Sequence, residues 1–314
     1  MVDASMDNTM EVEARAVEVS AGGRAMVDAG TRMVVLLGHP VHHSYSPAMQ
    51  NAAFRAAGLN LVYLAAAVPP ERLVAAVAAV AALDMPGANV TVPHKERVTS
   101  FLDEVVPEAR LLGAVNTIVH RDGRLVGHNT DGTGFLRALR EAGYDARGEA
   151  AVVLGAGGAA RAVALSLAME GAKEVVVFNR SADRAQQLAA LVRERGGERA
   201  EALSWEALEK QSREARSAFA RAGLVVQTTS LGMSPRPEDG PPVPPEWMSA
   251  NHLAYDLVYN PSETAFLRMA RQAGARTAGG AGMLLHQGAA AFELWTGREA
   301  PIGVMKQALE ACLG

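Results

Sequence analysis

Short apolar segments alternate with alanine-rich segments from Thr31 almost to the end of the chain. The apolar segments have the length and composition of β-strands, and the segments between them are typical of helices. Strands separated by helices usually run parallel, in sheets covered by helices on both faces. The sequence therefore predicts an α/β protein with parallel sheets. The expected strands are residues 33–38, 61–67, 88–92, 115–120, 124–127, 151–154, 174–178, 224–229 and 252–258, and the expected helices are residues 46–58, 69–83, 134–143, a segment ending at 171, 263–273, 281–296 and 303–312.

Composition limits the class of protein further. A length of 314 residues suggests two domains, at about 150 residues per domain. The net charge of −4 gives no reason to expect nucleic acid or an anionic membrane as a partner. Cys312 is the only cysteine and the eight histidines show no H-E-x-x-H spacing, so we expect neither disulfides nor a metal site. No apolar run reaches the ~18 residues of a membrane helix, and we expect a cytoplasmic protein.

The first thirty residues differ from the rest of the chain. Residues 1–30 lack sustained periodicity and mix acidic residues with small ones. A transit peptide would be poor in acids, and a signal peptide would need a longer apolar segment. The sequence therefore predicts a poorly ordered N-terminal extension.

Residues 155–160, GAGGAA, follow the predicted strand 151–154 directly and open a predicted helix. Gly155 permits a tight turn, Gly157 lets the backbone approach a pyrophosphate, and the small Ala160 lets the helix pack close to the sheet. The N-terminus of the helix would present amide groups and a positive dipole end to the phosphates. A glycine motif alone is weak evidence, but the strands before and after it favour a dinucleotide site.

The next strand ends in NRSADR, residues 179–184. An NAD site usually has an acidic residue here to bind the ribose 2′-hydroxyl, but this chain has Asn179, followed by Arg180 and Arg184. Guanidinium groups suit a 2′-phosphate, which a carboxylate would repel. The alternative is two ordinary surface arginines. These arginines lie where the residue that distinguishes NAD from NADP is expected, which favours NADP.

A lysine follows a predicted strand with one polar face. In NVTVPHK, residues 89–95, Val90 and Val92 would lie on the apolar face, and Pro93 would end the strand pairing before Lys95. A solvated surface lysine is the usual interpretation of a single Lys. The polar face leading to it indicates that Lys95 instead enters a polar pocket.

Other polar residues lie on segments that look buried. Ser44 and Ser46, in SYSP, could present two hydroxyls to a carboxylate beside a helix N-terminus, but Ser46 could equally cap that helix. Asp131 could likewise only cap the helix 134–143. Asn116 lies within an apolar strand and Gln287 on a small, apolar helix, and both need hydrogen-bond partners. Together these positions predict a pocket.

Nine motifs in this order resemble those of the shikimate dehydrogenase family, over residues 31–314. The resemblance implies a substrate-binding domain of residues 31–131 plus 283–314 and a Rossmann NADP-binding domain of residues 132–282. It implies the reversible NADPH-dependent reduction of 3-dehydroshikimate to shikimate in the chorismate and aromatic amino-acid pathway, with a small molecule as partner, by a monomer or homodimer. The motifs are SYSP, NVTVPHK, GAVNT, NTDG, GAGGAA, NRSADR, TSLGM, YDLVYNP and GMLLHQ.

The resemblance also implies roles for individual residues. Lys95 and Asp131 would form the catalytic pair, and Ser44 and Ser46 would bind the substrate carboxylate. Tyr259 would lie over the substrate. The residues that would bind ring hydroxyls are Thr91, Asn116, Asp131 and Gln287.

On the cofactor side, the pyrophosphate would lie against the glycine turn, and the nicotinamide would lie against Leu257 and Gly280. Thr91, Tyr259, Leu257 and Gly280 could instead be ordinary strand, packing, core and turn residues. The chain departs from the family pattern at His39, Gln227 and Pro107. The residues expected to bind the pyrophosphate are Gly155, Ala156, Gly157, Gly158 and Ala159, and those expected to bind the adenosine phosphate are Asn179, Arg180, Ser181 and Arg184.

Three other functions are alternatives to this one. A quinate/shikimate dehydrogenase is the nearest, but both serines favour shikimate and Arg180 argues against NAD. Another two-domain NADP-dependent dehydrogenase would not explain SYSP together with NVTVPHK. A catalytically silent NADP-sensing regulator would be expected to lack Lys95 or Asp131, and both are present.

Overall fold

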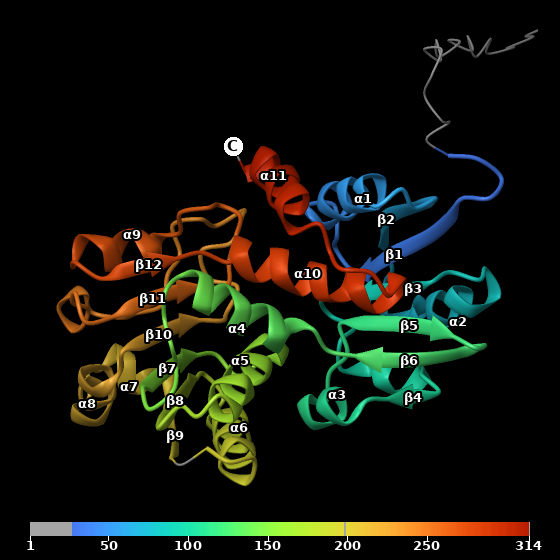
Figure 1. The fold of residues 1–314 in the computed structure, drawn as a ribbon. Helices are drawn as coiled ribbons and strands as arrows, with labels where there is room; N and C mark the ends of the chain where they lie inside the picture. Colours follow the sequence, from blue (N-terminus) through green and yellow to red (C-terminus); the bar gives the residue numbers. More distant parts are fainter. Residues whose placement is uncertain (1–26, 198, 314) are drawn as a thin grey trace, which may run out of the picture.

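A computed structural model describes residues 27–197 and 199–313, which form two six-stranded sheets, here called sheet A and sheet B (Figure 1). Sheet A has the strand order β2-β1-β3-β5-β6-β4 and sheet B the order β12-β11-β10-β7-β8-β9. The α/β class predicted from the sequence is confirmed. Sheet A consists of β1 (Arg32–Gly38), β2 (Leu61–Ala67), β3 (Gly87–Val90), β4 (Glu104–Val105), β5 (Thr117–Arg121) and β6 (Arg124–His128), and sheet B of β7 (Ala150–Leu154), β8 (Glu174–Asn179), β9 (Ala200–Ser204), β10 (Leu224–Gln227), β11 (Leu253–Asp256) and β12 (Arg276–Ala278).

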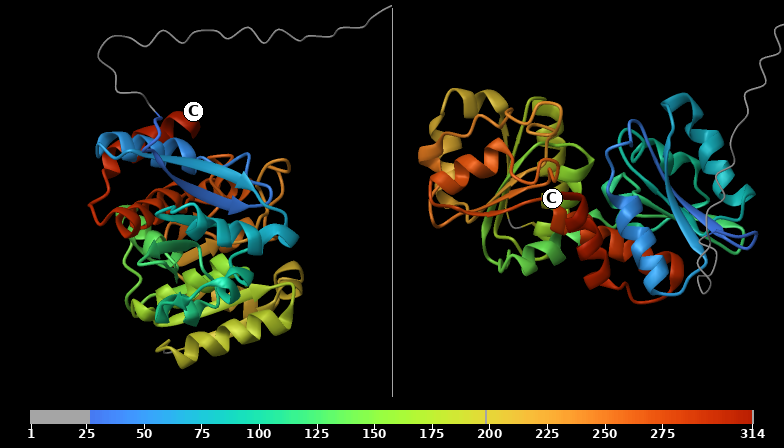
Figure 2. Two further views of the ribbon diagram at one scale, coloured as in Figure 1. Left: turned by 90° about the vertical axis from the view of Figure 1, so that its right-hand side faces the viewer. Right: turned by 90° about the horizontal axis from the view of Figure 1, so that it is seen from above.

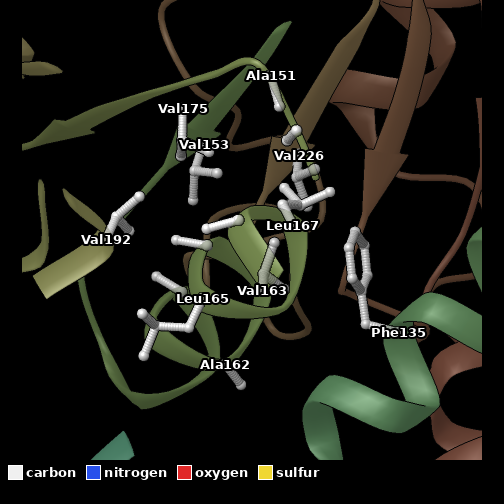
Figure 3. Close-up of a cluster of buried hydrophobic side chains, with 14 of the residues drawn as sticks. Phe135, Ala151, Val153, Ala162, Val163, Leu165, Leu167, Val175, Val192 and Val226 are labelled. Carbon is white, nitrogen blue, oxygen red and sulfur yellow. The ribbon is translucent and has the colours of Figure 1, made fainter. Parts of the chain in front are cut away.

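Sheet B is parallel throughout, as predicted. Alternate residues of β7 point to opposite faces. Ala151 and Val153 lie in one apolar core (Figure 3), and Val152 and Leu154 lie in the other. The first core lies under α4, α5 and α6, and the second under α7, α8 and α9. These helices are α4 (Asp131–Glu141), α5 (Gly158–Met169), α6 (Ala182–Glu194), α7 (Trp205–Glu209), α8 (Arg213–Arg221) and α9 (Ala265–Gln272).

Sheet A is mixed rather than parallel, which corrects the prediction. β1 pairs parallel with β2 and β3, but β5 pairs antiparallel with β3 and β6. The β5–β6 pair is antiparallel because the turn between these strands is short, and its residues Asp122 and Gly123 have φ of 52° and 74°. Two residues cannot carry the chain back to the start of a parallel strand, and positive φ at both is typical of a hairpin turn.

Helices also cover both faces of sheet A. α2 (Leu73–Ala82) and α3 (Pro107–Leu112) lie on one face, and α1 (Ser46–Ala56), α10 (Ala281–Thr296) and α11 (Ile302–Leu313) lie on the other. α10 runs from the end of sheet B across to sheet A, so C-terminal residues complete the N-terminal half (Figures 1 and 2). The predicted domain boundaries, at 131/132 and 282/283, stay predictions.

α4 and α10 cross closely, and this crossing brings the two halves of the chain together. A Cβ atom added to Gly134 would lie 2.7 Å from the backbone nitrogen of Gln287, so only glycine permits the approach. The crossing places Gln287 of α10 beside the first turn of α4.

Some predicted boundaries differ from the structure. The strand predicted at 88–92 ends at Val90, and Val92 is 69% exposed rather than on an apolar face. The helix predicted at 134–143 begins earlier, at Asp131. Of the predicted N-terminal extension, residues 1–26 lie outside the described residues. Residues 27–30 form a turn in which Asp28 accepts a hydrogen bond from Asn60 at 2.9 Å.

Candidate active site

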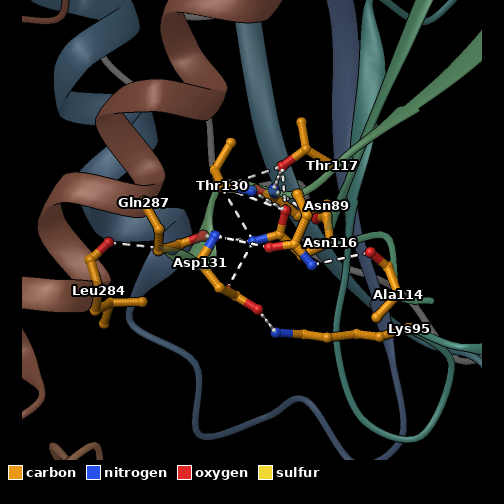
Figure 4. A network of polar contacts seen from close by, with 10 residues as sticks. Asn89, Lys95, Ala114, Asn116, Thr117, Thr130, Asp131, Leu284 and Gln287 are labelled. Carbon is orange, nitrogen blue, oxygen red and sulfur yellow. Dashed lines mark hydrogen bonds and ion pairs between the residues drawn. The ribbon is translucent and has the colours of Figure 1, made fainter. Parts of the chain in front are cut away.

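An ion pair between Lys95 and Asp131 lies beside the end of β3 (Figure 4). The distance from Lys95 Nζ to Asp131 Oδ2 is 2.6 Å, and the two side chains are 20% and 6% exposed. Asp131 is the first residue of α4, and Thr130 occupies the N-cap position. The Asp131 carboxylate contacts Lys95 instead of capping the helix, so the capping interpretation is wrong.

Asn116 holds the other oxygen of this carboxylate. Its amide nitrogen donates to Asp131 Oδ1 at 2.8 Å, and its carbonyl oxygen accepts from the backbone nitrogen of Thr130 at 2.8 Å. These bonds explain why a buried polar residue stands between apolar ones: Asn116 fixes the start of α4 against sheet A. Both oxygens of Asp131 are therefore satisfied from fixed directions.

Two further predicted residues border this pair. Gln287 Oε1 lies 3.5 Å from the Asn116 amide nitrogen, and Gln287 Nε2 donates to Leu284 O at 3.1 Å. Thr91 follows β3 directly and is half-buried, with its backbone nitrogen bonded to Leu37 O. The structure thus brings Lys95, Asn116, Asp131 and Gln287 together.

Ser44 and Ser46 lie at the start of α1. Ser46 is the first residue of that helix and makes no capping bond, so the interpretation of Ser46 as an N-cap is wrong. Its backbone nitrogen donates to Ser44 Oγ at 3.3 Å. The Ser44 side chain is half-buried. Two hydroxyls beside a helix N-terminus can bind a carboxylate.

Tyr259 joins the two halves of the site. It follows β11 of sheet B, and its ring lies 5.6 Å from that of Tyr45, next to both serines. Burial raises the pKa of Tyr259, and the nearby Tyr45 acts in the same direction. The neutral phenol of Tyr259 therefore faces the start of α1.

The glycine motif forms a turn between β7 and α5. Gly155 has φ of +119°, and a Cβ atom there would lie 2.5 Å from Thr228 Oγ1. Cβ atoms at Gly157 and Gly158 would meet nothing within 4 Å, and the N-cap Gly157 offers no side chain to the first amides of α5. Ala156 and Ala159 are half-buried. The turn therefore leaves open space before unsatisfied helix amides, as a phosphate requires.

The predicted adenosine-phosphate residues lie at the end of β8. Asn179 Nδ2 donates to Ser181 O at 3.0 Å, and Ser181 caps α6 by accepting from the Arg184 nitrogen. Arg180 and Arg184 are exposed, and neither guanidinium forms an ion pair within the described part of the chain. Two uncompensated cations at this point fit a 2′-phosphate.

Leu257 and Gly280 lie together beyond the end of β11. A Cβ atom on Gly280 would clash with Leu257 O, and the Gly280 nitrogen donates to Val258 O. Nearby, the buried Gln227 holds its own loop: its amide donates to Leu231 O at 2.9 Å, and its oxygen accepts from the Thr229 nitrogen at 2.6 Å. Gln227, where the chain departs from the family pattern, therefore forms hydrogen bonds within its own loop.

Sequence reasoning missed several buried polar residues. Asp256, within YDLVYNP, accepts from Thr264 Oγ1 at 2.6 Å and from the Val258 nitrogen at 2.9 Å, and burial raises its pKa to about 7. An acidic residue inside an apolar strand was the available signal. Tyr63, Asn89, Thr117 and Thr130 were also given no role, although all belong to the network around Asn116.

Other features are separate from this site. A cavity of about 240 Å³ lies between α4, α10 and α11 and is lined in part by Tyr255 and Lys306. Residues 27–197 and 199–313 contain no group of three or more acidic, histidine or cysteine side chains that could hold a metal. Within the same ranges, no helix is both long and apolar enough to cross a membrane.

Comparison with known proteins agrees with this geometry. Models of the shikimate dehydrogenase substrate-binding domain, of shikimate/quinate 5-dehydrogenase and of the shikimate 5′-dehydrogenase C-terminal domain match residues 36–118, 137–222 and 280–310. A shikimate dehydrogenase (NADP(+)) of Moorella thermoacetica is 53% identical, over 92% of this chain and 96% of its own.

Two solved structures have the same fold. Shikimate 5-dehydrogenase of Listeria monocytogenes, in complex with shikimate and NAD, has a TM-score of 0.83 and 37% identity, and the match covers 90% of this chain and 97% of the other. The enzyme of Thermus thermophilus, in complex with NADP(H) and shikimate, has a TM-score of 0.79 and 39% identity, covering 90% and 100%. This chain belongs to the shikimate dehydrogenase family.

Proposed function

We propose that this enzyme interconverts shikimate and 3-dehydroshikimate with NADP(H), in the chorismate and aromatic amino-acid pathway. The observation that carries the proposal is the 2.6 Å ion pair between Lys95 Nζ and Asp131 Oδ2. Oxidation of a secondary alcohol needs a group beside the reacting oxygen that exchanges its proton, and this pair can do so. The Moorella relative named for this activity with NADP(+) supports the assignment.

The residues of the glycine turn and of the end of β8 would hold the cofactor. The open space at Gly157 and Gly158 fits a pyrophosphate, and the exposed Arg180 and Arg184 fit a 2′-phosphate. Leu257 and Gly280 would border the nicotinamide. When bound, NADP⁺ supplies the acceptor for the hydride that leaves the alcohol carbon.

The substrate would lie between the starts of α1 and α4. Ser44 and Ser46 would bind its carboxylate, while Tyr259 covers it from the side of sheet B. The amide groups of Asn116 and Gln287, with the Thr91 hydroxyl, would orient the ring hydroxyls. These contacts fix which carbon faces the nicotinamide.

Lys95 and Asp131 would manage the proton. In oxidation, the O–H bond breaks and its proton passes to the pair as the C–H electron pair leaves the carbon and the carbonyl forms. The ammonium of Lys95 stabilises the negative charge that develops on the oxygen. In reduction, Lys95 donates a proton to the carbonyl oxygen.

Initial rates with shikimate and quinate, each with NADP⁺ and NAD⁺, test the function. We expect shikimate with NADP⁺ to have the highest kcat/KM of the four pairs. A higher kcat/KM with quinate would replace the proposal with a quinate dehydrogenase. No turnover of either substrate, with NADP⁺ binding intact, would instead favour a regulator.

The proposal also covers the cellular location and the oligomeric state of the protein. As a biosynthetic enzyme, the protein would act in the cytoplasm, as a monomer or homodimer. Cell fractionation and light scattering measure the two properties directly. Recovery in a membrane fraction, or a mass above that of a dimer, would contradict them.

A further inference from the structure

The side chain of Asp256 joins the two ends of the loop between β11 and α9, residues 257–263, here called the β11–α9 loop. Asp256 is the last residue of β11, and Thr264 is the N-cap of α9. Asp256 Oδ1 accepts a hydrogen bond from the Val258 nitrogen at 2.9 Å, and Oδ2 accepts one from Thr264 Oγ1 at 2.6 Å. Both Asp256 and Thr264 are 0% exposed. One buried carboxyl group therefore fastens both ends of the loop.

The partners of this carboxyl group are themselves anchored. Asp256 lies opposite Gln227 in the parallel pairing of β11 with β10. The Thr264 hydroxyl also accepts from the Leu267 nitrogen at 3.3 Å, which ties it to the first turn of α9. The hydroxyl has its proton and a second lone pair left for Asp256, so it can donate to an ionised carboxylate or accept from a protonated one. The link between Asp256 and Thr264 therefore forms in both protonation states.

The β11–α9 loop carries Tyr259 toward the other half of the candidate site. The centroid of the Tyr259 ring lies 5.6 Å from that of Tyr45, the N-cap residue of α1. Tyr45 stands between Ser44 and Ser46 in the sequence. Tyr259 thus faces the end of the site that is assigned to the substrate carboxylate.

The position of Tyr259 depends on the ends of the loop more than the position of Leu257 does. The Leu257 nitrogen donates to a carbonyl of β10 at 2.9 Å, so the neighbouring strand holds this residue directly. The carbonyls of Val258 and Asn260, which flank Tyr259, accept backbone bonds of 3.2 and 3.3 Å. Both bonds to Asp256 are shorter than these. Breaking a bond to Asp256 should therefore loosen Tyr259 and leave Leu257 in place.

We propose that Asp256 is a positioning residue for substrate binding, which holds Tyr259 over the substrate by linking Val258 to Thr264. The inference rests on the proposed function, in which Tyr259 covers the substrate. Asp256 itself touches neither the substrate nor the cofactor. Because Tyr259 faces the carboxylate end, its contacts with the substrate should be similar in the ground state and the transition state. A loosened Tyr259 should therefore raise KM rather than lower kcat.

Thr264→Val tests the proposal, because it removes the hydroxyl that bonds to Asp256 and nearly preserves the shape of the side chain. We expect the KM for shikimate to rise by about three- to tenfold, as for one lost buried hydrogen bond, with kcat and the KM for NADP⁺ within about twofold of wild type. Thr264→Ser retains the hydroxyl and should keep the wild-type KM. Initial rates with shikimate and NADP⁺ give all of these constants. An equal rise in both KM values would indicate general loosening of sheet B and would contradict the proposal.

Ser212→Ala is the matched control, because Ser212 also caps a helix beside sheet B. Its hydroxyl accepts from the Ala215 nitrogen at 3.1 Å at the start of α8. Thr264→Val and Ser212→Ala each remove a capping hydroxyl, so both should lower Tm. Only Thr264→Val should raise the KM for shikimate. The same rise in Ser212→Ala would show that the lost cap is responsible and would overturn the proposal.

A double variant shows whether the effect passes through Tyr259. In a Tyr259→Ala background, Thr264→Val should raise the KM for shikimate no further, because the residue that is positioned is absent. The same fold-rise in both backgrounds would refute the proposal, as would a KM for shikimate within about twofold of wild type in Thr264→Val alone.

Hydrogen exchange of the Val258 amide in the wild type provides the test if Thr264→Val does not fold. We expect slow exchange, because this amide donates to the buried Asp256 carboxyl group. Exchange as fast as in an unfolded peptide would overturn the proposal. Turnover of shikimate with NADP⁺ by the wild type, measured first, tests the proposed function separately.

Discussion

Two buried aspartates, one beside each sheet, have different surroundings. Asp131, beside sheet A, has one carboxylate oxygen bonded to the Lys95 ammonium and the other to the Asn116 amide. Asp256, at the end of β11 in sheet B, accepts from the Thr264 hydroxyl and a backbone amide, and no ion pair to it occurs within the described residues. A cation thus accompanies the buried carboxylate assigned to chemistry, whereas the other carboxylate sits among neutral donors.

The other candidate residues around the two sheets also differ in how far their polar groups already have partners. Around sheet A, the candidate groups are buried or half-buried, and Asn116, Asp131 and Lys95 are bonded to one another. Around sheet B, the open glycine turn and the exposed Arg180 and Arg184 have unsatisfied hydrogen-bond or charge capacity. The difference indicates a preorganised region that performs chemistry and an open region that receives a cofactor.

The largest effect is expected at the ion pair. Lys95→Ala and Asp131→Asn should each lower kcat by about 10²–10⁴, because proton exchange and charge stabilisation are lost together. The double variant should be far less impaired than the product of the single effects, because the two residues act as one unit. Single-turnover rates of shikimate oxidation measure this. Multiplicative losses would show that the residues work independently.

The second buried aspartate should appear in stability rather than in turnover. Its pKa of about 7 exceeds the ordinary 3.8, so the folded protein retains a proton that the unfolded chain releases. The stability contributed by Asp256 is therefore present below pH 4 and is lost as the pH rises toward 7. Relative to Asp256→Asn, the wild type should lose about 3 kcal/mol of unfolding free energy between pH 5 and pH 8.

Urea unfolding of both proteins at several pH values measures this difference. Asp122→Asn, on the exposed β5–β6 turn, is the control for removing a carboxylate, since asparagine also tolerates the positive φ of this position. A difference between wild type and Asp256→Asn that does not change with pH would mean that Asp256 is not protonated in the folded state.

Cofactor choice should respond to the exposed arginines by a smaller factor. We expect kcat/KM for NADP⁺ to exceed that for NAD⁺ by about tenfold or more, since charge-assisted contacts to a 2′-phosphate are worth roughly 1.5–3 kcal/mol each before screening. Arg180→Asp should erase or reverse the preference. Arg213→Asp, the same change on an exposed arginine of α8, should leave it intact. Equal use of both cofactors by the wild type would remove the basis for this assignment.

The smallest effect is expected at the N-terminus. Removing residues 1–30 should leave kcat unchanged and lower Tm by no more than about 2 °C. Of the contacts described there, the bond from Asn60 to Asp28 is exposed to solvent, where a hydrogen bond contributes little. Differential scanning calorimetry of both chains checks this. A fall of many degrees would show that the segment packs against the core.

Local patterns predicted the parts of the structure that are built locally. The glycine turn lies between a strand and a helix as GAGGAA indicates, and the arginines follow β8 as NRSADR indicates. The antiparallel hairpin of sheet A is also a local feature, because Asp122-Gly123 is a common hairpin sequence, whereas strand–helix alternation alone predicts parallel pairing.

The remaining errors concern long-range contacts. The bond between Asn89 and Thr117 depends on the register of two strands, and the contact from Tyr63 depends on the order β2-β1-β3. Asp131 was open to interpretation as a cap because its partner Lys95 is 36 residues away. Spacing along a sequence predicts periodic faces and turns, but it does not specify which buried polar groups meet across a sheet.

The division between the two regions can be tested by one paired measurement on Lys95→Ala and Arg180→Asp. NADPH binding, followed by fluorescence, and kcat for shikimate are determined for both variants. The account predicts that Lys95→Ala binds NADPH as the wild type does but loses about 10²–10⁴ in kcat, whereas Arg180→Asp binds NADPH weakly and keeps near-normal kcat with saturating NAD⁺. If Lys95→Ala instead retains more than about a third of wild-type kcat, the activation free energy has changed by less than about 1 kcal/mol. That result would contradict the central assignment of the ion pair.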